Sequence, residues 1–172
     1  MSWYNPFWDE NWNIQIFYEI KNWKELIIVK ITSPAFKDNE KVPAKYTCDG
    51  QDINPPLNID DLPKDAKELA IIIEDPDAPS KTWTHWLVYN MPVNIHIDEN
   101  SVPGKQGMND FGKKKYNGPC PPSGQQHRYY FKVFALDERL ELDSGLTKKE
   151  LETAMEGHIL EQAQLVVSYR RR

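Results

Sequence analysis

The chain has 172 residues, of which 40% are hydrophobic and 27% charged, with a net charge of −5 and an isoelectric point near 5.4. This length favours one domain with a single hydrophobic core. The acidic balance argues against nucleic acid as a partner, because phosphate backbones are bound by clustered Lys and Arg, and no stretch holds the roughly 18 apolar residues of a transmembrane segment.

The first 25 residues form an extension that is unusually rich in aromatic side chains. It contains four of the six tryptophans, among Trp3, Tyr4, Phe7, Trp8, Trp12, Phe17, Tyr18 and Trp23. So many exposed rings would lower solubility, so we expect the segment to cover its own domain, to form a homodimer, or to make weak membrane contact. A fourth interpretation is that translation starts further downstream. Asp9 and Glu10 lie where a signal peptide would be apolar, so we expect a cytoplasmic protein.

Four runs predict β-strands in the domain itself, residues 26–172. They cover residues 25–32, 67–75, 82–90 and 127–135. Each is a short run rich in β-branched or aromatic residues, and most are bounded by turn formers. Between these runs, residues 41–65 and 91–126 are rich in Gly, Pro and Asn, which predicts turns, short edge strands and functional loops.

One helix is predicted to begin at Thr147, whose hydroxyl can cap the first turn while Glu150 completes a capping box. Its narrow apolar stripe consists of Leu151, Ala154 and Met155. Gly157 is expected to end it, and residues 164–169 predict a closing strand. A continuous helix through residue 163 is the competing prediction.

Two dense basic runs stand out in this acidic chain. We interpret residues 113–115 as a solvated loop and residues 170–172 as a frayed terminus rather than as a nucleic-acid site.

The two cysteines, Cys48 and Cys120, are too few for a disulfide framework and lack the spacing of a metal site. We therefore do not expect a structural bridge, and the sequence leaves their redox state open.

Polar residues gather at the ends of three predicted strands. Side chains alternate along a strand, so one face would hold Trp83, His85, Leu87 and Tyr89, and a second strand would place His127, Tyr129, Phe131 and Val133 together. Asp75 follows a hydrophobic run at the point where a buried strand enters a loop. If these strands are neighbours, one pocket contains two imidazoles, a phenol and a carboxylate.

Four stretches of the chain resemble a known family. They are YTCDGQDINPPL, EDPDAPSKTWTHWLVYNMP, GMNDFGKKKYNGPCPPSGQQHRYYFKVFALD and LTKKELETAMEGHIL. They are similar to the phosphatidylethanolamine-binding protein family, in the bacterial and archaeal branch that resembles Raf kinase inhibitor protein. The resemblance runs from about Leu26 to Tyr169.

The resemblance implies a mainly β fold of two antiparallel sheets, one short helix towards the C-terminus, and a small pocket for phosphate-type anions. Carried over by position, the pocket residues are Asp75, Trp83, His85, Gly118, Pro119, His127 and Tyr129. Eukaryotic members add a C-terminal helix at the pocket rim. This chain ends at Arg172 just after the predicted closing strand, so we expect a more open pocket.

Each pocket residue has an expected role. His85 and His127 would donate hydrogen bonds to the anion, together with Tyr129 and the backbone of Gly118 and Pro119. Trp83 would form an apolar wall. A carboxylate repels an anion, so we expect Asp75 to orient an imidazole, to bind an amine head group, or only to cap a turn.

Other chemistry remains open at this stage. His85 alone is typical of a buried structural histidine. Asp75 with the two histidines also matches a two-histidine, one-carboxylate metal triad, without the usual His spacing. A nucleophilic Cys120 or Ser123 beside His127 is a further alternative. The run from Gly107 to Lys114 nearly matches a phosphate-binding loop, and it contains the D-F-G sequence of protein kinases. It lacks the other features of both motifs.

The sequence therefore predicts a non-enzymatic, regulatory binding protein for phosphate-type anions or phosphorylated head groups, without cofactor or metal. The alternative is a protein-surface inhibitor of serine proteases or of a kinase, with loops 33–56 and 98–124 as the contact surface. Such roles are attached to similar proteins, but one fold supports many functions.

Overall fold

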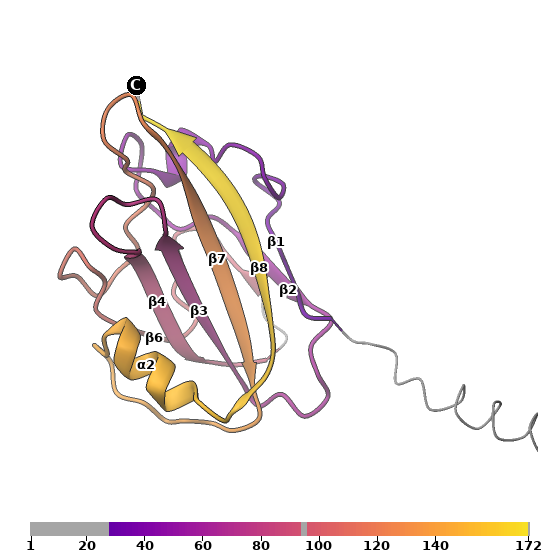
Figure 1. Ribbon diagram of the computed structural model, residues 1–172. Helices are drawn as coiled ribbons and strands as arrows, with labels where there is room; N and C mark the ends of the chain where they lie inside the picture. The colour runs from indigo at the N-terminus through magenta and orange to yellow at the C-terminus, as the bar shows by residue number, and fades with distance from the viewer. Residues whose placement is uncertain (1–27, 94–95, 172) are drawn as a thin grey trace, which may run out of the picture.

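The computed structural model describes residues 28–93 and 96–171 and shows two antiparallel sheets and one α-helix (Figure 1). The larger sheet has the order β6-β4-β3-β7-β8. Its strands are β3 (Glu68–Asp75), β4 (Trp83–Met91), β6 (Lys105–Gln106), β7 (Gln126–Leu136) and β8 (Ile159–Arg170). The smaller sheet, in the order β1-β2-β5, comprises β1 (Lys30–Thr32), β2 (Leu57–Asp60) and β5 (His96–Ile97). A 3-10 turn, η1 (Ala44–Tyr46), and the helix α2 (Lys148–Met155) complete the described elements. The predicted fold class is confirmed.

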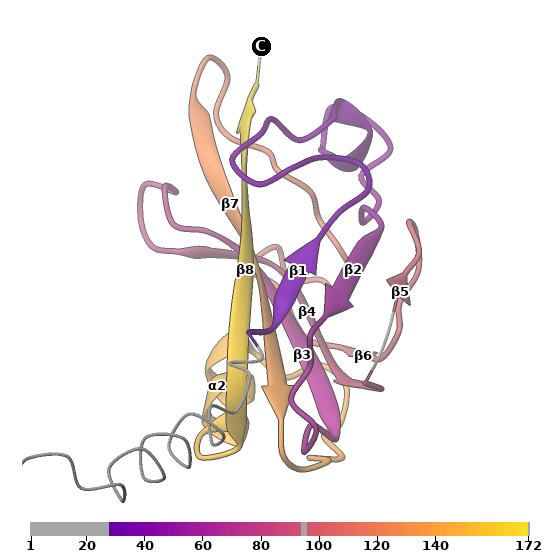
Figure 2. The same ribbon diagram turned by 90° about the vertical axis from the view of Figure 1, so that its right-hand side faces the viewer.

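The larger sheet is buried on both faces. Figure 2 shows the smaller sheet on one side of it and α2 on the other. Along β3, Ile71 and Ile73 pack in the core between the sheets, whereas Ala70 and Ile72 pack in the core under α2. This explains why β3 is a continuous apolar run rather than an alternating one.

The predicted helix and closing strand are both present. Thr147 caps α2 with the complete capping box to Glu150. Gly157 has φ of 84°, a left-handed conformation that favours glycine, and it reverses the chain into β8. The competing helix through residue 163 is wrong, since β8 pairs with β7 along almost its whole length.

The basic C-terminus is more ordered than predicted. Arg170 pairs with Gln126 at the end of β8, and Nε of Arg171 lies 3.1 Å from Oδ1 of Asp49. The prediction of a frayed terminus is therefore wrong for these two arginines. The other basic run, residues 113–115, is exposed as expected.

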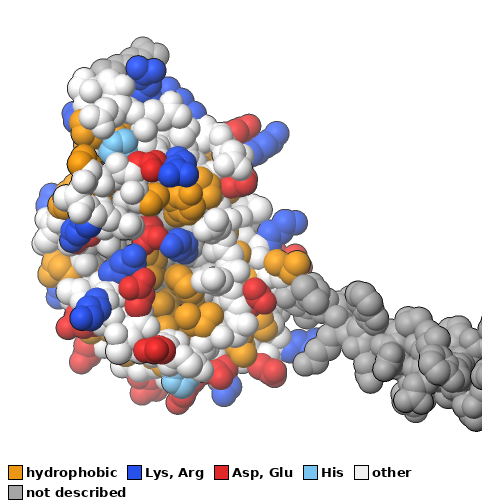
Figure 3. Space-filling model, viewed as in Figure 1, with side chains coloured by type: hydrophobic (Ala, Val, Ile, Leu, Met, Phe, Trp, Pro, Cys, Tyr) orange, Lys and Arg blue, Asp and Glu red, His pale blue; other side chains and the backbone are white. Residues whose placement is uncertain are grey.

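The chemistry of the remaining surface is mixed. On the face shown in Figure 3, acidic and basic side chains are interspersed, with small hydrophobic patches between them. Within the described ranges, no helix is long and apolar enough to cross a membrane. The expectations for the aromatic extension concern residues that the structure does not describe.

Candidate functional site

The predicted site residues meet at one end of the larger sheet. The C-terminal end of β3 and the N-terminal ends of β4 and β7 lie together there, at the upper end in Figure 1. The antiparallel register pairs Asp75 with Trp83, and it places Tyr129 one step beyond the Glu74–Tyr130 pair. Neighbouring strands thus bring together side chains that are about fifty residues apart in the sequence.

A β-bulge sets the direction of His85. Residue Glu74 pairs with Thr84 and Ile73 with Trp86, so His85 is the additional residue of β4. Its ring packs against Tyr129, which belongs to the core between the sheets, whereas Leu87 and Tyr89 belong to the core under α2. The predicted shared face of His85, Leu87 and Tyr89 is therefore wrong, because a bulge shifts the alternation of side chains.

Asp75 orients one imidazole and caps a turn. Its Oδ2 lies 2.7 Å from Nδ1 of His127, and both side chains are 5% exposed. Its Oδ1 accepts a hydrogen bond of 2.8 Å from the backbone N–H of Asp77. Nε2 of His127 lies 3.2 Å from the side-chain amide oxygen of Gln125. Two of the roles considered for Asp75 are thus present together, and the imidazole it orients is that of His127.

His85 is held by a backbone carbonyl. Its Nδ1 lies 2.7 Å from the carbonyl oxygen of Asn117. A carbonyl only accepts hydrogen bonds, so Nδ1 carries a proton, and Nε2 holds the lone pair in the neutral ring. Burial lowers the pKa of His85, and the carbonyl of Asn117 and the charges of Asp75 and Asp52 offset this only in part. His85 is therefore neutral at neutral pH.

Two shielded donors of the site, the indole N–H of Trp83 and the hydroxyl of Tyr129, make no hydrogen bond of ordinary geometry within the described part of the chain. The Tyr129 ring contacts His85, and its hydroxyl interacts with the Asp75 carboxylate and the Cys120 backbone, whereas the Trp83 ring contacts Phe111. Burial, reinforced by the charge of Asp75, raises the pKa of Tyr129 far above its usual value, so the hydroxyl keeps its proton. Trp83 was expected to form an apolar wall. Its ring also carries a shielded N–H group without a hydrogen-bond partner in the described residues. Buried donors are normally paired, so these two are exceptions that need an explanation.

The Gly118 loop is joined to the loop that follows η1. The backbone N–H of Gly118 donates to Oδ1 of Asp52 at 2.6 Å, and the N–H of Cys48 donates to the carbonyl of Pro119 at 3.2 Å. A Cβ atom on residue 118 would lie 2.2 Å from the carbonyl oxygen of Tyr46, so this close approach requires glycine. The expectation that the Gly118 N–H donates to a ligand is wrong for this conformation, because Asp52 already accepts from it.

A disulfide closes the same two loops. Cys48 and Cys120 are bonded, with their Cα atoms 5.4 Å apart. The expectation of no bridge is wrong, because it relied on cysteine number and spacing, whereas the fold brings residues 72 positions apart into contact. A bonded Cys120 is not a nucleophile, which removes that alternative. Persistent disulfides are typical of oxidising compartments, and the cytoplasmic location stays a prediction.

The sequence did not single out Asn109 and Phe111 as site residues. The side-chain amide of Asn109 donates to the carbonyl of His85 and to Oδ1 of Asn117. The ring of Phe111 meets the rings of His85 and Trp83 edge-on, at centroid distances of 5.3 and 5.6 Å. Both lie in the G-M-N-D-F-G stretch that resembles a phosphate-binding loop, and Asn109 precedes the D-F-G sequence directly.

The metal alternative has no geometric support in the described residues. They contain no group of three or more His, Cys, Asp or Glu side chains that could hold a metal ion.

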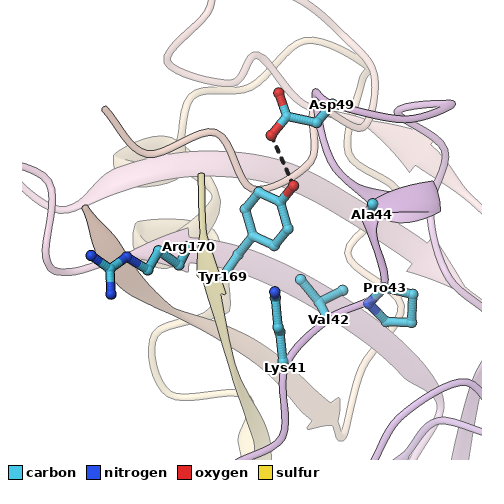
Figure 4. Close-up of a pocket in the computed structure, with 7 residues that line it drawn as sticks. All are labelled: Lys41, Val42, Pro43, Ala44, Asp49, Tyr169 and Arg170. Atoms are coloured by element: carbon cyan, nitrogen blue, oxygen red, sulfur yellow. Dashed lines mark hydrogen bonds between the residues drawn. The ribbon is translucent and has the colours of Figure 1, made fainter. Parts of the chain in front are cut away.

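A separate cavity lies behind the loop that follows η1. It has a volume of about 660 Å³ and is lined by Lys41, Val42, Pro43, Ala44, Asp49, Tyr169 and Arg170 (Figure 4). The hydroxyl of Tyr169 donates to Oδ2 of Asp49 at 2.8 Å across it. None of the predicted site residues lines this cavity, so it is distinct from the candidate site.

Comparison with known proteins identifies the family and the class of fold. The sequence model of the phosphatidylethanolamine-binding protein family matches residues 32–170. The chain therefore belongs to the phosphatidylethanolamine-binding protein family.

Individual relatives match over most of their length. A UPF0098 protein of Methanothermobacter thermautotrophicus is 47% identical over 151 residues, which cover 83% of this chain and 99% of that protein. A UPF0098 protein of Pyrococcus horikoshii is 48% identical over 160 residues, covering 87% of this chain and 80% of the relative.

Two solved structures share the fold. The crystal structure of CT736, a putative phosphatidylethanolamine-binding protein homologue from Chlamydia trachomatis, superposes with a TM-score of 0.81 at 40% identity, covering 85% of this chain and 99% of the other. That of E. coli YbcL, described as a new member of the mammalian family, gives 0.77 at 28% identity, covering 84% and 99%.

Proposed function

We propose that the protein is a non-enzymatic, regulatory binding protein whose site at the end of β3, β4 and β7 accepts a phosphate-type anion or a phosphorylated head group. The observation that carries this proposal is a pair of shielded donors without a hydrogen bond of ordinary geometry, Trp83 Nε1–H and Tyr129 O–H, whose rings are linked through those of Phe111 and His85. Leaving a buried donor unpaired costs about 1–3 kcal/mol, and an acceptor ligand removes this penalty.

The charges around the site are compatible with an anion. The carboxylate of Asp75 would repel it, but both of its oxygens are engaged by His127 and by the Asp77 N–H. Neutral His85 presents a lone pair at Nε2, so an anion at this position favours proton uptake by the ring. The protonated ring then donates to the anion while Nδ1 keeps its bond to the Asn117 carbonyl.

One of the two candidate nucleophiles is excluded by the disulfide. Cys120 is in a disulfide, so it offers no thiolate beside His127. The name of the family refers to binding of a phospholipid head group, which suggests the same chemistry for this chain.

The alternative of a protein-surface inhibitor rests on the resemblance alone. Its two contact loops, 33–56 and 98–124, are joined to each other at the site through Asp52 and Gly118 and through the disulfide. The two functions are separable by one variant: His85→Ala is expected to abolish anion binding and to leave any inhibition of a protease intact.

Calorimetric titration with phosphoethanolamine at fixed ionic strength tests the proposal. The wild type is expected to bind at one site per chain, and His85→Ala to bind at least about tenfold more weakly, since it loses a charge-assisted hydrogen bond. His158→Ala is the matched control, because His158 pairs with Asp137 at the opposite end of β7. Equal affinity of the wild type and His85→Ala would refute the proposed site.

A further inference from the structure

The side chain of Phe111 forms the outermost layer of the anion site. Exposure increases from Tyr129 at 0%, through His85 at 2%, to Phe111 at 39%. The ring of His85 lies between the other two, with centroid distances of 5.2 Å to Tyr129 and 5.3 Å to Phe111. A group attached to an anion at His85 and directed towards solvent therefore passes beside Phe111.

The turn that carries Phe111 is anchored by one buried amide. Asn109 is 3% exposed, and its Oδ1 accepts from the backbone N–H groups of Phe111 at 3.1 Å and Lys113 at 2.9 Å. Its Nδ2 donates to the carbonyl of His85 and to Oδ1 of Asn117. The position of the ring is thus coupled to the same strand and loop that hold His85.

A second anchor joins this turn to the beginning of β4. The N–H of Asp110 donates to the carbonyl of Thr84 at 3.0 Å, and Oδ2 of Asp110 accepts from the N–H of Thr84 at 2.7 Å. Lys81 forms an ion pair with the same carboxylate. Phe111 is therefore a partly exposed aromatic ring on a turn that is held in place by hydrogen bonds to β4. Its ring contacts that of Trp83, whose indole N–H has no hydrogen-bond partner in the described residues.

We propose that Phe111 is a specificity-determining residue of this site, whose ring contacts the organic group of a bound phosphate monoester. The inference rests on the proposed anion site and names its ligand class: a phosphate that carries an apolar or aromatic substituent, rather than free phosphate. An aromatic ring that is apolar, rigid and partly exposed adds contact area with little loss of side-chain freedom. Inorganic phosphate can contact the donors, but it has no organic group for the Phe111 ring to contact, so this ring adds nothing to its affinity.

The test compares phenyl phosphate with inorganic phosphate as calorimetric ligands for four proteins. The wild type is expected to prefer phenyl phosphate, and Phe111→Ala to lose about three- to tenfold in affinity for it with less than about twofold change for inorganic phosphate. Phe111→Tyr keeps the ring and is expected to keep the preference. Ile159→Ala is the control, because Ile159 is similarly exposed, at 43%, but lies at the far end of β8.

The outcomes separate this inference from the proposed function. No binding of either ligand by the wild type refutes both. Binding of phosphate without preference, or an equal change for both ligands in Phe111→Ala, refutes only the role of Phe111. If Phe111→Ala does not fold, Phe111→Leu replaces it, because leucine retains an apolar cover without the ring.

Discussion

At the scale of single residues, the hydroxyl of Tyr129 is expected to contribute to anion binding and not to the stability of the fold. It is buried and protonated, it makes no hydrogen bond of ordinary geometry within the described ranges, and it interacts with the Asp75 carboxylate and the Cys120 backbone. Its removal in Tyr129→Phe is expected to leave the free energy of unfolding unchanged or to raise it by up to about 1 kcal/mol, because an unpaired buried group is lost. The affinity for phosphoethanolamine is expected to fall several-fold. Urea denaturation and calorimetry measure the two effects, and a clear loss of stability would contradict the assignment.

His85 gives the site its expected pH dependence. Burial lowers its pKa in the free protein, whereas a bound anion raises it, so binding takes up a proton. The affinity for sulfate, which does not titrate in this range, is expected to rise as the pH falls from 8 to 6, by up to about tenfold per unit. The charges of Asp75 and Asp52 act on His85 in both states, and His127 lies on the other side of Asp75. His85→Gln is expected to flatten the profile, and a flat profile in the wild type would exclude this mechanism.

Sequence reasoning found the strand residues of the site better than the loop residues. Asp75, His85, His127 and Tyr129 lie at strand ends that neighbouring turn signals indicate, although the alternation of side chains put His85 on the wrong face. Phe111 and Asn109 lie in a turn without periodicity, so only the folded chain reveals their contacts with His85. The occupied N–H of Gly118 was missed for the same reason, since Asp52 reaches it from a loop 66 residues away.

At the scale of elements, the site depends on two loops that are tied across the end of the larger sheet. The bond between Cys48 and Cys120 spans 72 residues, so it restricts a long loop in the unfolded chain. We expect Cys48→Ser with Cys120→Ser to lower the free energy of unfolding by about 2–4 kcal/mol. Anion affinity is expected to fall as well, because the Gly118 loop loses a tether. Denaturation with and without reductant measures the first effect, and wild-type stability that reductant leaves unchanged would show that the bridge is not formed.

On the other face of the sheet, ion pairs attach α2 to β3 and β7. A variant that removes them is expected to affect stability and not anion binding. The carboxylate of Glu74 on β3 forms ion pairs with Lys132 on β7 and with Lys148 on α2. Burial acts to raise the pKa of Glu74, but the two ammonium groups outweigh it, and the pKa is lowered. Its stabilising contribution is therefore complete above the ordinary glutamate pKa and lost as the pH falls through the lowered value.

Glu74→Gln is expected to lower the free energy of unfolding at pH 7 by about 1–3 kcal/mol, with little effect on anion affinity. The difference from the wild type should shrink as the pH falls below the ordinary glutamate range and through the lowered pKa, where the wild-type carboxylate also becomes protonated. Denaturation curves recorded from neutral pH down through the acid range measure this. A difference that stays the same across this range would show that the ion pairs do not stabilise α2.

The elements themselves were largely predictable from hydrophobic pattern and capping residues. β3, β4, β7 and α2 were predicted within a few residues, because each combines a strong periodicity or capping box with clear turn signals. β8 begins five residues earlier than predicted, at Ile159, because its first half is largely exposed, mixes apolar and polar residues, and is stabilised by pairing with β7. The bulge at His85 has no signal in the sequence, since it arises from the register between two strands.

At the scale of the whole molecule, the fold is a rigid support that presents polar groups at one end. Both faces of the larger sheet are covered, one by the smaller sheet and the other by α2, so the strand ends are fixed by two cores. The loops that close this end carry several of the polar groups of the site, as is common in proteins that bind ligands at the edge of a sheet. Every residue assigned to the site lies between Cys48 and Tyr129, well away from the aromatic extension in the sequence.

The measurement that tests the central claim most directly is an NMR titration that follows the indole N–H signal of Trp83 as phosphoethanolamine is added. Trp83→Phe assigns this signal among those of the six tryptophans. If the unpaired N–H donates a hydrogen bond to the anion, its proton signal moves downfield and saturates in the wild type, and it does not move in His85→Ala. A Trp83 signal that stays in place in the wild type while the ligand binds elsewhere would contradict the account.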